Sequence, residues 1–189
     1  MTCWRALLNS VTLACLLLWS LPVAANDEVF VVETAHASQR DEVYFLTAVF
    51  DLNLPEYIVS SVEQGFELPL VVEIEVFRKR SFWFDKREQY IRFDYRINYR
   101  SMLDSVSVFH VNSGQRKEYP SLKEALDSLT IIFDQPMLDA RILDNDEAYR
   151  GRIRIGIAQD YIPLPLKSSS VWENDWTLAS DWEPWDIER

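Results

Sequence analysis

The sequence predicts a β-rich domain, mainly antiparallel and sandwich-like, that carries two short helices. The strongest support comes from residues 87–99 and 148–158, where apolar and polar side chains alternate at every second position. Successive side chains of a strand point to opposite faces, so this alternation indicates one buried and one solvated face, as in an antiparallel sheet. One curved sheet with both helices on the same face is the alternative that the pattern leaves open.

Further strands are expected where β-branched and aromatic residues cluster between turn signals. Residues 29–32 and 43–52 should form a hairpin around the polar segment 38–41, and a long strand should run over residues 70–84 to a turn at Asp85. Residues 106–111 should continue the meander to a turn at Gly114. About six or seven strands follow from this assignment.

Two segments have the apolar spacing and the end signals of helices. Residues 55–64 begin with Pro55, which suits the first helical turn, and Gly65 suits a left-handed stop. The second helix should begin at Ser121, because Ser121 and Glu124 form a capping box, and Pro136 should end it. Its apolar face would include Leu129 and extend to Ile132 or Phe133.

The N-terminus has the features of a cleaved signal peptide. Arg5 precedes an apolar stretch over residues 6–21, which is shorter than the roughly 20 residues of a membrane span, and small residues follow up to Ala25. We expect cleavage after Ala25, which leaves residues 26–189 as one domain with a Trp-rich tail at 171–189. The Leu-rich run beyond Cys15 argues against lipidation of that cysteine. An exported, periplasmic protein is therefore expected.

Both cysteines, Cys3 and Cys15, lie within the signal, so the mature chain should contain neither a disulfide nor a thiolate. The formal net charge is −11 at pH 7, and loss of Arg5 makes the mature chain more negative still. Such an acidic protein is not expected to bind nucleic acid or anionic lipid. No other apolar run approaches the length of a membrane span.

Signatures of catalysis are missing from the sequence. The four glycines form no phosphate-binding loop, and the two histidines, His36 and His110, have no second histidine at metal-ligand spacing. Asp144 and Asp146 begin like a calcium loop, but Tyr149 replaces the required glycine. No metal and no cofactor are predicted, and a non-enzymatic role is favoured.

Arginines and tryptophans supply the candidate binding residues. Arg150, Arg152 and Arg154 share one face of a predicted strand, and Arg92, Arg96 and Arg100 do so on another. We expect them to pair with acids such as Asp94, Glu73 and Glu75 across the sheet, with an anion-binding or partner-docking face as the alternative. The candidate aromatic residues are Trp83, Trp182 and Trp185.

The tail from Trp172 to Trp185 contains four tryptophans, and we expect it to clasp the domain rather than extend from it. Pro184 should hold Trp182 and Trp185 as one wedge, which we expect to pack against residues 87–99 or near Phe84. A stacking platform for ligands is the alternative that the aromatic density leaves open.

Three segments together resemble an uncharacterised family of exported proteobacterial proteins, known as a domain of unknown function. These segments are Gly65-Phe-Glu-Leu-Pro69, the run 77–85, and Asp175-Trp-Thr-Leu-Ala-Ser-Asp-Trp182 with Trp185. The resemblance covers nearly the whole mature chain. It implies a Gram-negative periplasm and, through the neighbourhood of the genes, a membrane sensor kinase as a partner.

Three functions are compatible with these features. The leading hypothesis is a non-enzymatic periplasmic module that binds a protein of the envelope or of a signalling system. The second is a carbohydrate- or peptide-binding domain that uses exposed tryptophans. The third is an acid–base hydrolase, which would need two carboxylates, such as Glu73 and Glu75 or Asp181 and Glu183, to converge in a cleft.

We predict that the mature protein begins at Asn26, because small side chains precede the bond that signal peptidase would cleave. The measurement is the intact mass and N-terminal sequence of the exported protein. A product that retains Cys3, or that carries lipid on Cys15, would contradict this assignment.

Overall fold

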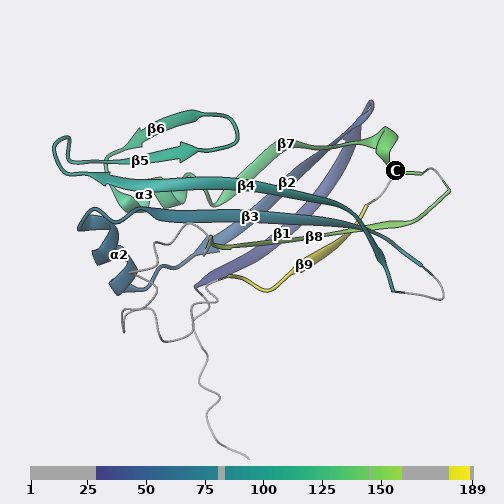
Figure 1. Cartoon of the computed structure of the whole chain (residues 1–189), viewed down its shortest axis with the longest axis horizontal. Coiled ribbons are helices and arrows are strands. Elements are labelled where there is room, and N and C mark those ends of the chain that lie inside the picture. The colour runs from purple at the N-terminus through teal and green to yellow at the C-terminus, as the bar shows by residue number, and fades with distance from the viewer. Residues whose placement is uncertain (1–28, 81–83, 145, 159–178, 188–189) are drawn as a thin grey trace, which may run out of the picture.

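A computed structural model of the chain describes residues 29–80, 84–144, 146–158 and 179–187. These residues contain nine strands, two short α-helices and one 3-10 turn (Figure 1). In chain order the elements are β1 Phe30–Arg40, β2 Val43–Leu52, α2 Glu56–Glu63, β3 Leu68–Arg78, β4 Lys86–Arg100, β5 Ser105–His110, β6 Gln115–Tyr119, α3 Leu122–Asp127, β7 Ile131–Asp139, η1 Ala140–Ile142, β8 Tyr149–Ile157 and β9 Glu183–Ile187.

The strands form two antiparallel sheets of unequal width. The smaller sheet has the order β1-β2-β7, and the larger sheet has the order β6-β5-β4-β3-β8-β9. Two sheets around a shared core confirm the sandwich-like prediction, and the alternative of a single curved sheet is wrong. The described residues contain more strands than expected, because β6, β7 and β9 were not assigned from the sequence.

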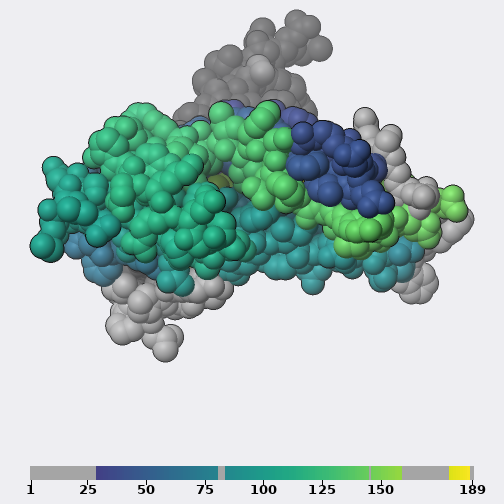
Figure 2. Space-filling view, turned by 90° about the horizontal axis from the view of Figure 1, so that it is seen from above, coloured from purple at the N-terminus to yellow at the C-terminus, as the bar shows by residue number. Residues whose placement is uncertain are grey.

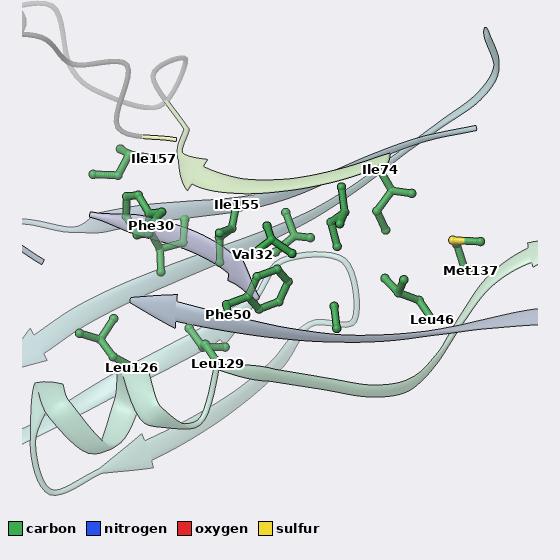
Figure 3. Packing of buried hydrophobic residues seen from close by; sticks show 14 of the residues in the cluster. Phe30, Val32, Leu46, Phe50, Ile74, Leu126, Leu129, Met137, Ile155 and Ile157 are labelled. Atoms are coloured by element: carbon green, nitrogen blue, oxygen red, sulfur yellow. The ribbon is translucent and has the colours of Figure 1, made fainter. Parts of the chain in front are cut away.

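The core lies between the two sheets (Figure 3). Phe30, Leu46 and Phe50 of the smaller sheet face Ile74 of β3 and Ile155 of β8, and all five are nearly inaccessible to water. β3 lies near the middle of the larger sheet and is buried along most of its length. Apolar burial on this scale is the main stabilising term for a domain of this size.

Most of the expected turns are confirmed by the backbone. Gly65 follows α2 with φ of 95°, and Gly114 joins β5 to β6 with φ of 69°, both in the left-handed region that glycine tolerates. Asp41 reverses the chain between β1 and β2 with φ of 55°. β3 ends at Arg78, before the expected turn at Asp85.

The second helix is much shorter than predicted. Ser121 accepts a hydrogen bond from the backbone N–H of Glu124 at 3.2 Å, as expected for the capping box. The helix nevertheless ends at Asp127, and the β-branched residues that follow enter β7. There they pair with β2, because strand pairing suits Ile131 and Ile132 better than an exposed helical turn. Pro136 lies within β7, an edge strand, where a missing N–H costs little.

The C-terminal tail returns to the domain as β9, an edge strand that pairs with β8. Trp185 lies opposite Gly151 and is buried, with 8% of its surface exposed. A Cβ atom on Gly151 would lie 2.3 Å from the indole carbons, so the missing side chain makes room for the ring. Trp182 stacks instead on arginine side chains of β8. The expected single wedge against β4 is therefore wrong, because three positions along an extended chain place the two rings on opposite faces.

The two sides of the sandwich are closed to different extents. On one side β1 lies against β8 and β9, whereas α3 contacts β5 and β6 at the opposite edge of the larger sheet. On the other side the edge strands are β6 of the larger sheet and β7 of the smaller one. Within the described ranges, no strand joins β6 to β7. This open side of the sandwich is called the seam below.

Replacement of Trp185 by Ala should destabilise the fold by about 3–5 kcal/mol, because it removes a buried indole that fills the space above Gly151. Trp182→Ala is the matched control and should cost about 1–2 kcal/mol, since that ring is half-buried and stacks on Arg152 and Arg154 on the outer face. Urea unfolding at neutral pH measures both. Equal costs for the two variants would contradict this packing.

Candidate functional site

The arginines predicted from the sequence lie on the outer face of the larger sheet, and they are paired with acids. Arg154 donates to Glu73 at 2.6 Å, and Arg152 donates to Glu75 at 2.7 Å, each directly across from its partner on β3. Arg150 forms an ion pair with Asp85 at 2.5 Å. The expected pairing across the sheet is thus observed for these arginines.

The second set of arginines, on β4, is paired as well. Arg92 contacts Asp94 at 2.9 Å, and Arg100 contacts Glu118 at 3.0 Å. Arg96 lies 3.7 Å from Glu67. The outer face of the larger sheet is therefore a mosaic of opposite charges rather than a positive stripe.

Glu75 is the buried centre of the network on this outer face, with 5% of its surface exposed. Burial alone would raise the pKa of Glu75, but hydrogen bonds from Arg87 and Arg152 outweigh it and hold the pKa below its ordinary value. Arg87 donates to the other carboxylate oxygen at 2.7 Å. Glu75 is therefore ionised and saturated with donors, which does not suit a general acid.

Aromatic rings cover the arginines of β8. The ring of Trp182 lies 4.4 Å from the guanidinium carbon of Arg152 and 4.5 Å from that of Arg154. Phe77 lies 4.8 Å from the same carbon of Arg152. Such cation–π contacts attach the tail to the sheet. Trp83 lies outside the described residues, and a binding role for Trp182, Trp185 or the arginines stays a prediction.

A groove of about 500 Å³ opens at the seam, and no pattern in the sequence predicts it. Its lining comes from β4, β5, β6 and their connections in the larger sheet, from the end of α3, and from β7 of the smaller sheet. In Figure 2 the surface is hollowed between the teal β5–β6 hairpin and the green segment of β7. The lining residues that matter below are Phe93, Tyr95, His110, Lys117, Ile131 and Phe133.

Aromatic rings and one lysine, Lys117, characterise the described lining of this seam groove. Tyr95 and His110 meet edge to face, with ring centroids 4.6 Å apart. Burial raises the pKa of Tyr95 to about 12. The pKa of His110 is lowered from its ordinary value, first by burial and then by the positive charge of Lys117. The aromatic pair is therefore uncharged at neutral pH, and Lys117 supplies positive charge.

The chemistry available in the seam groove is that of binding. Asp94 is the one carboxylate in its described lining, and Arg92 occupies that carboxylate. Elsewhere, Glu73 and Glu75 share a face of β3 but are each bound by arginine. No group of three or more His, Cys, Asp or Glu side chains that could hold a metal occurs in the described part of the chain.

The sequence could not reveal the seam groove for identifiable reasons. Either Ile132 or Phe133 was expected on a buried helical face, whereas Phe133 lies on an edge strand with 79% of its surface exposed. Lys117 lies on β6, which has no apolar alternation to mark it as a strand. The polar composition of β6 was consistent with a turn extension, so nothing drew attention to its side chains.

Arg152→Ala should cost about 1–2 kcal/mol of stability at neutral pH, because it removes one donor from buried Glu75 while Arg87 remains. Arg150→Ala, on an exposed pair, should cost under about 1 kcal/mol.

The low folded-state pKa of Glu75 stabilises the protein above the ordinary carboxyl pKa, and this contribution is lost as pH falls through the lowered value. The difference between the variants should therefore shrink in acid. Urea unfolding at two pH values measures it, and a difference that grows in acid would contradict the assignment.

Comparison with known proteins identifies a family and adds no activity. Neither the curated proteins nor the solved structures contain a match to this chain. A family model described as a domain of unknown function (DUF4390) matches residues 27–186. This range includes every strand of both sheets except Ile187, the final residue of β9. The chain therefore belongs to the DUF4390 family.

Proposed function

We propose that the protein is a non-enzymatic module of the cell envelope that binds a partner protein at the seam groove. The observation that carries this proposal is the pair of exposed apolar side chains on β7. Ile131 and Phe133 leave 57% and 79% of their surfaces in water, side by side on an edge strand that borders a cavity. Exposed apolar groups beside a concavity are typical of partner-binding surfaces.

Other surfaces have weaker claims to a partner. The arginines and Trp182 on the outer face already contact one another and the acids of β3 and β4. Phe84 and Met102 are also exposed, by 90% and 98%. Phe84 lies just before β4 and Met102 just after it, and neither lines the seam groove. The seam groove combines exposed apolar groups, a free strand edge and depth.

The chemistry of the groove supports binding rather than catalysis. A hydrolase that works through two carboxylates needs both to approach the same bond, and the described groove lining offers only Asp94, which Arg92 occupies. Tyr95 has a raised pKa and His110 a lowered one, so neither carries charge at neutral pH. These groups suit the accommodation of an apolar side chain.

Location in the periplasm is part of the proposal and rests on the N-terminal sequence. In the described part of the chain, no helix has the length and apolarity needed to cross a membrane. A partner in the envelope, such as the extracytoplasmic part of a membrane sensor kinase, follows from the family resemblance. The choice among envelope proteins is left to the experiment below.

A photoactivatable benzoylphenylalanine at position 133 should cross-link to a discrete protein in the envelope of living cells. The same residue at position 84 is the matched control, because Phe84 is also highly exposed but lies at the opposite end of β4 from the groove lining of β5 and β6. Adducts are detected as mass shifts on immunoblots and identified by peptide mass. Ile131→Asp should abolish the adduct at 133.

An adduct from position 84 with none from position 133, or no adduct from either position, would contradict the proposed function. Circular dichroism and thermal unfolding of the substituted proteins confirm that the fold is retained. Because both positions are exposed, neither substitution should change stability by more than about 0.5 kcal/mol.

A further inference from the structure

The free edge of β7 presents backbone groups to solvent at the seam. The carbonyl of Thr130 accepts from the amide of Phe50 at 2.7 Å, and the next pairs are Val49 with Ile131 and Ala48 with Ile132. Hydrogen-bonded and non-hydrogen-bonded pairs alternate along an antiparallel ladder. The N–H and C=O of Ile131 therefore point away from β2. Within the described residues β7 pairs with β2 alone, so these groups can accept an added strand.

The seam groove lies beside this edge and has room for a side chain. Its aromatic lining includes Phe93, Tyr95 and His110 from the larger sheet, and Phe133 from β7. Its volume of about 500 Å³ falls within the range of pockets that hold small ligands or peptide side chains. An extended chain paired with β7 would direct alternate side chains into this space.

Lys117 gives the seam groove a positive charge. Lys117 of β6 lies directly opposite Val108 of β5. Because the side chain of Val108 is fully buried in the core, Lys117 projects toward the same inner side of the larger sheet. Its charge is felt by His110, whose pKa it lowers. Lys117 forms no ion pair with any residue in the described ranges, whereas Asp94 in the same lining is bound by Arg92 at 2.9 Å. The groove thus has one cation to offer to an anionic ligand.

We propose that the seam groove binds the free C-terminal end of an extended partner chain whose last residue is apolar. The chain would add to the edge of β7, its final side chain would enter the groove, and Lys117 would bind its terminal carboxylate. The proposal rests on the proposed function, since it specifies which part of the partner docks. Charge complementarity selects a chain end over an internal segment that lacks Asp and Glu. Only the chain end has a backbone carboxylate, which it carries whatever its side chains are.

The acidity of the whole protein sharpens this selectivity. With a net charge of −11, the protein repels acidic segments at long range, but at physiological salt such repulsion is screened beyond about 8 Å. A single terminal carboxylate that reaches Lys117 experiences the local cation. Acidic side chains elsewhere in a partner would be disfavoured, so apolar or basic residues should precede the chain end.

The test uses the exported protein and a library of synthetic hexapeptides. The first five positions are randomised, and the last is fixed in turn as Phe, Leu, Val, Ala, Lys or Asp. Each pool is made as the free acid and as the amide, and binding is measured by fluorescence polarisation. Free acids that end in Phe, Leu or Val should bind about tenfold more tightly than their amides, since the neutral amide cannot form an ion pair with Lys117.

Lys117→Gln should remove this preference, so that acid and amide bind alike. Lys123→Gln is the matched control, because Lys123 is an exposed lysine of the adjacent α3 that pairs with Asp127 instead of lining the groove. It should leave the preference unchanged. Binding of decanoate is measured separately by calorimetry, and binding of decanoate without binding of any peptide would indicate a small carboxylate ligand and overturn the proposal.

Three results would separate the two proposals. Peptides that bind equally as acid and amide, with loss on Phe133→Ser, would overturn the chain-end inference but leave partner binding at the seam intact. Absence of binding by every pool would overturn the inference, while the cross-link from position 133 would still decide the proposed function. Tight binding that Lys117→Gln does not weaken would also overturn it.

Discussion

Three strands have to cover the apolar inner face of six, and most features of this fold follow from that mismatch. β1 and β2 lie over β3 and β8, where Ile74 and Ile155 are excluded from water. α3 covers part of what remains by placing Leu126 against the inner side of β5 and β6. The rest of the inner face, around Phe93 and His110, is the seam groove. The groove is thus a consequence of sheet widths rather than of any one loop.

The opposite side shows how the same chain closes an edge. β9 extends the larger sheet beyond β8, and β1 packs against both strands. Trp185 occupies the space that Gly151 leaves on the inner face, while Trp182 binds the arginines of β8 on the outer face. One short strand is therefore held through its two faces, which suits a C-terminal segment that must stay attached. The seam has no such closing strand among the described residues, and this asymmetry is the physical reason for placing a partner there.

Much of the fold could be predicted because alternation along β4 and β8 is strict and because Ser121 and Gly65 mark helix ends chemically. The same alternation predicted that Arg152 and Arg154 share one face, whereas their register against Glu75 and Glu73 is set by the pairing of β8 with β3. The boundary between α3 and β7 could not be predicted, since the apolar residues after Leu129 fit both the periodicity of a helix and that of a strand. Their conformation is decided by pairing with β2, a contact distant in sequence.

The face of the larger sheet on which each of Trp182 and Trp185 lies could not be predicted from the sequence either. An odd spacing of three separates Trp182 from Trp185, so their rings diverge if the segment is extended and could meet if it is a turn. Only the pairing of β9 with β8 selects the extended form. Prediction of the seam groove would have needed two facts together. One is that the residues after Leu129 form a strand, and the other is that this strand lies at the edge of its sheet. Its residues Lys117 and Phe133 have no local signal for either.

Amide hydrogen exchange in the free protein tests the central claim, an uncovered strand edge at the seam, most directly. Ile131 and Ile132 are neighbours on β7, but the amide of Ile131 faces solvent and that of Ile132 faces β2. Site-resolved exchange by nuclear magnetic resonance should therefore be fast at Ile131 and much slower at Ile132. Equal, strong protection at both amides would show that the edge is already covered and would contradict the account of an open seam.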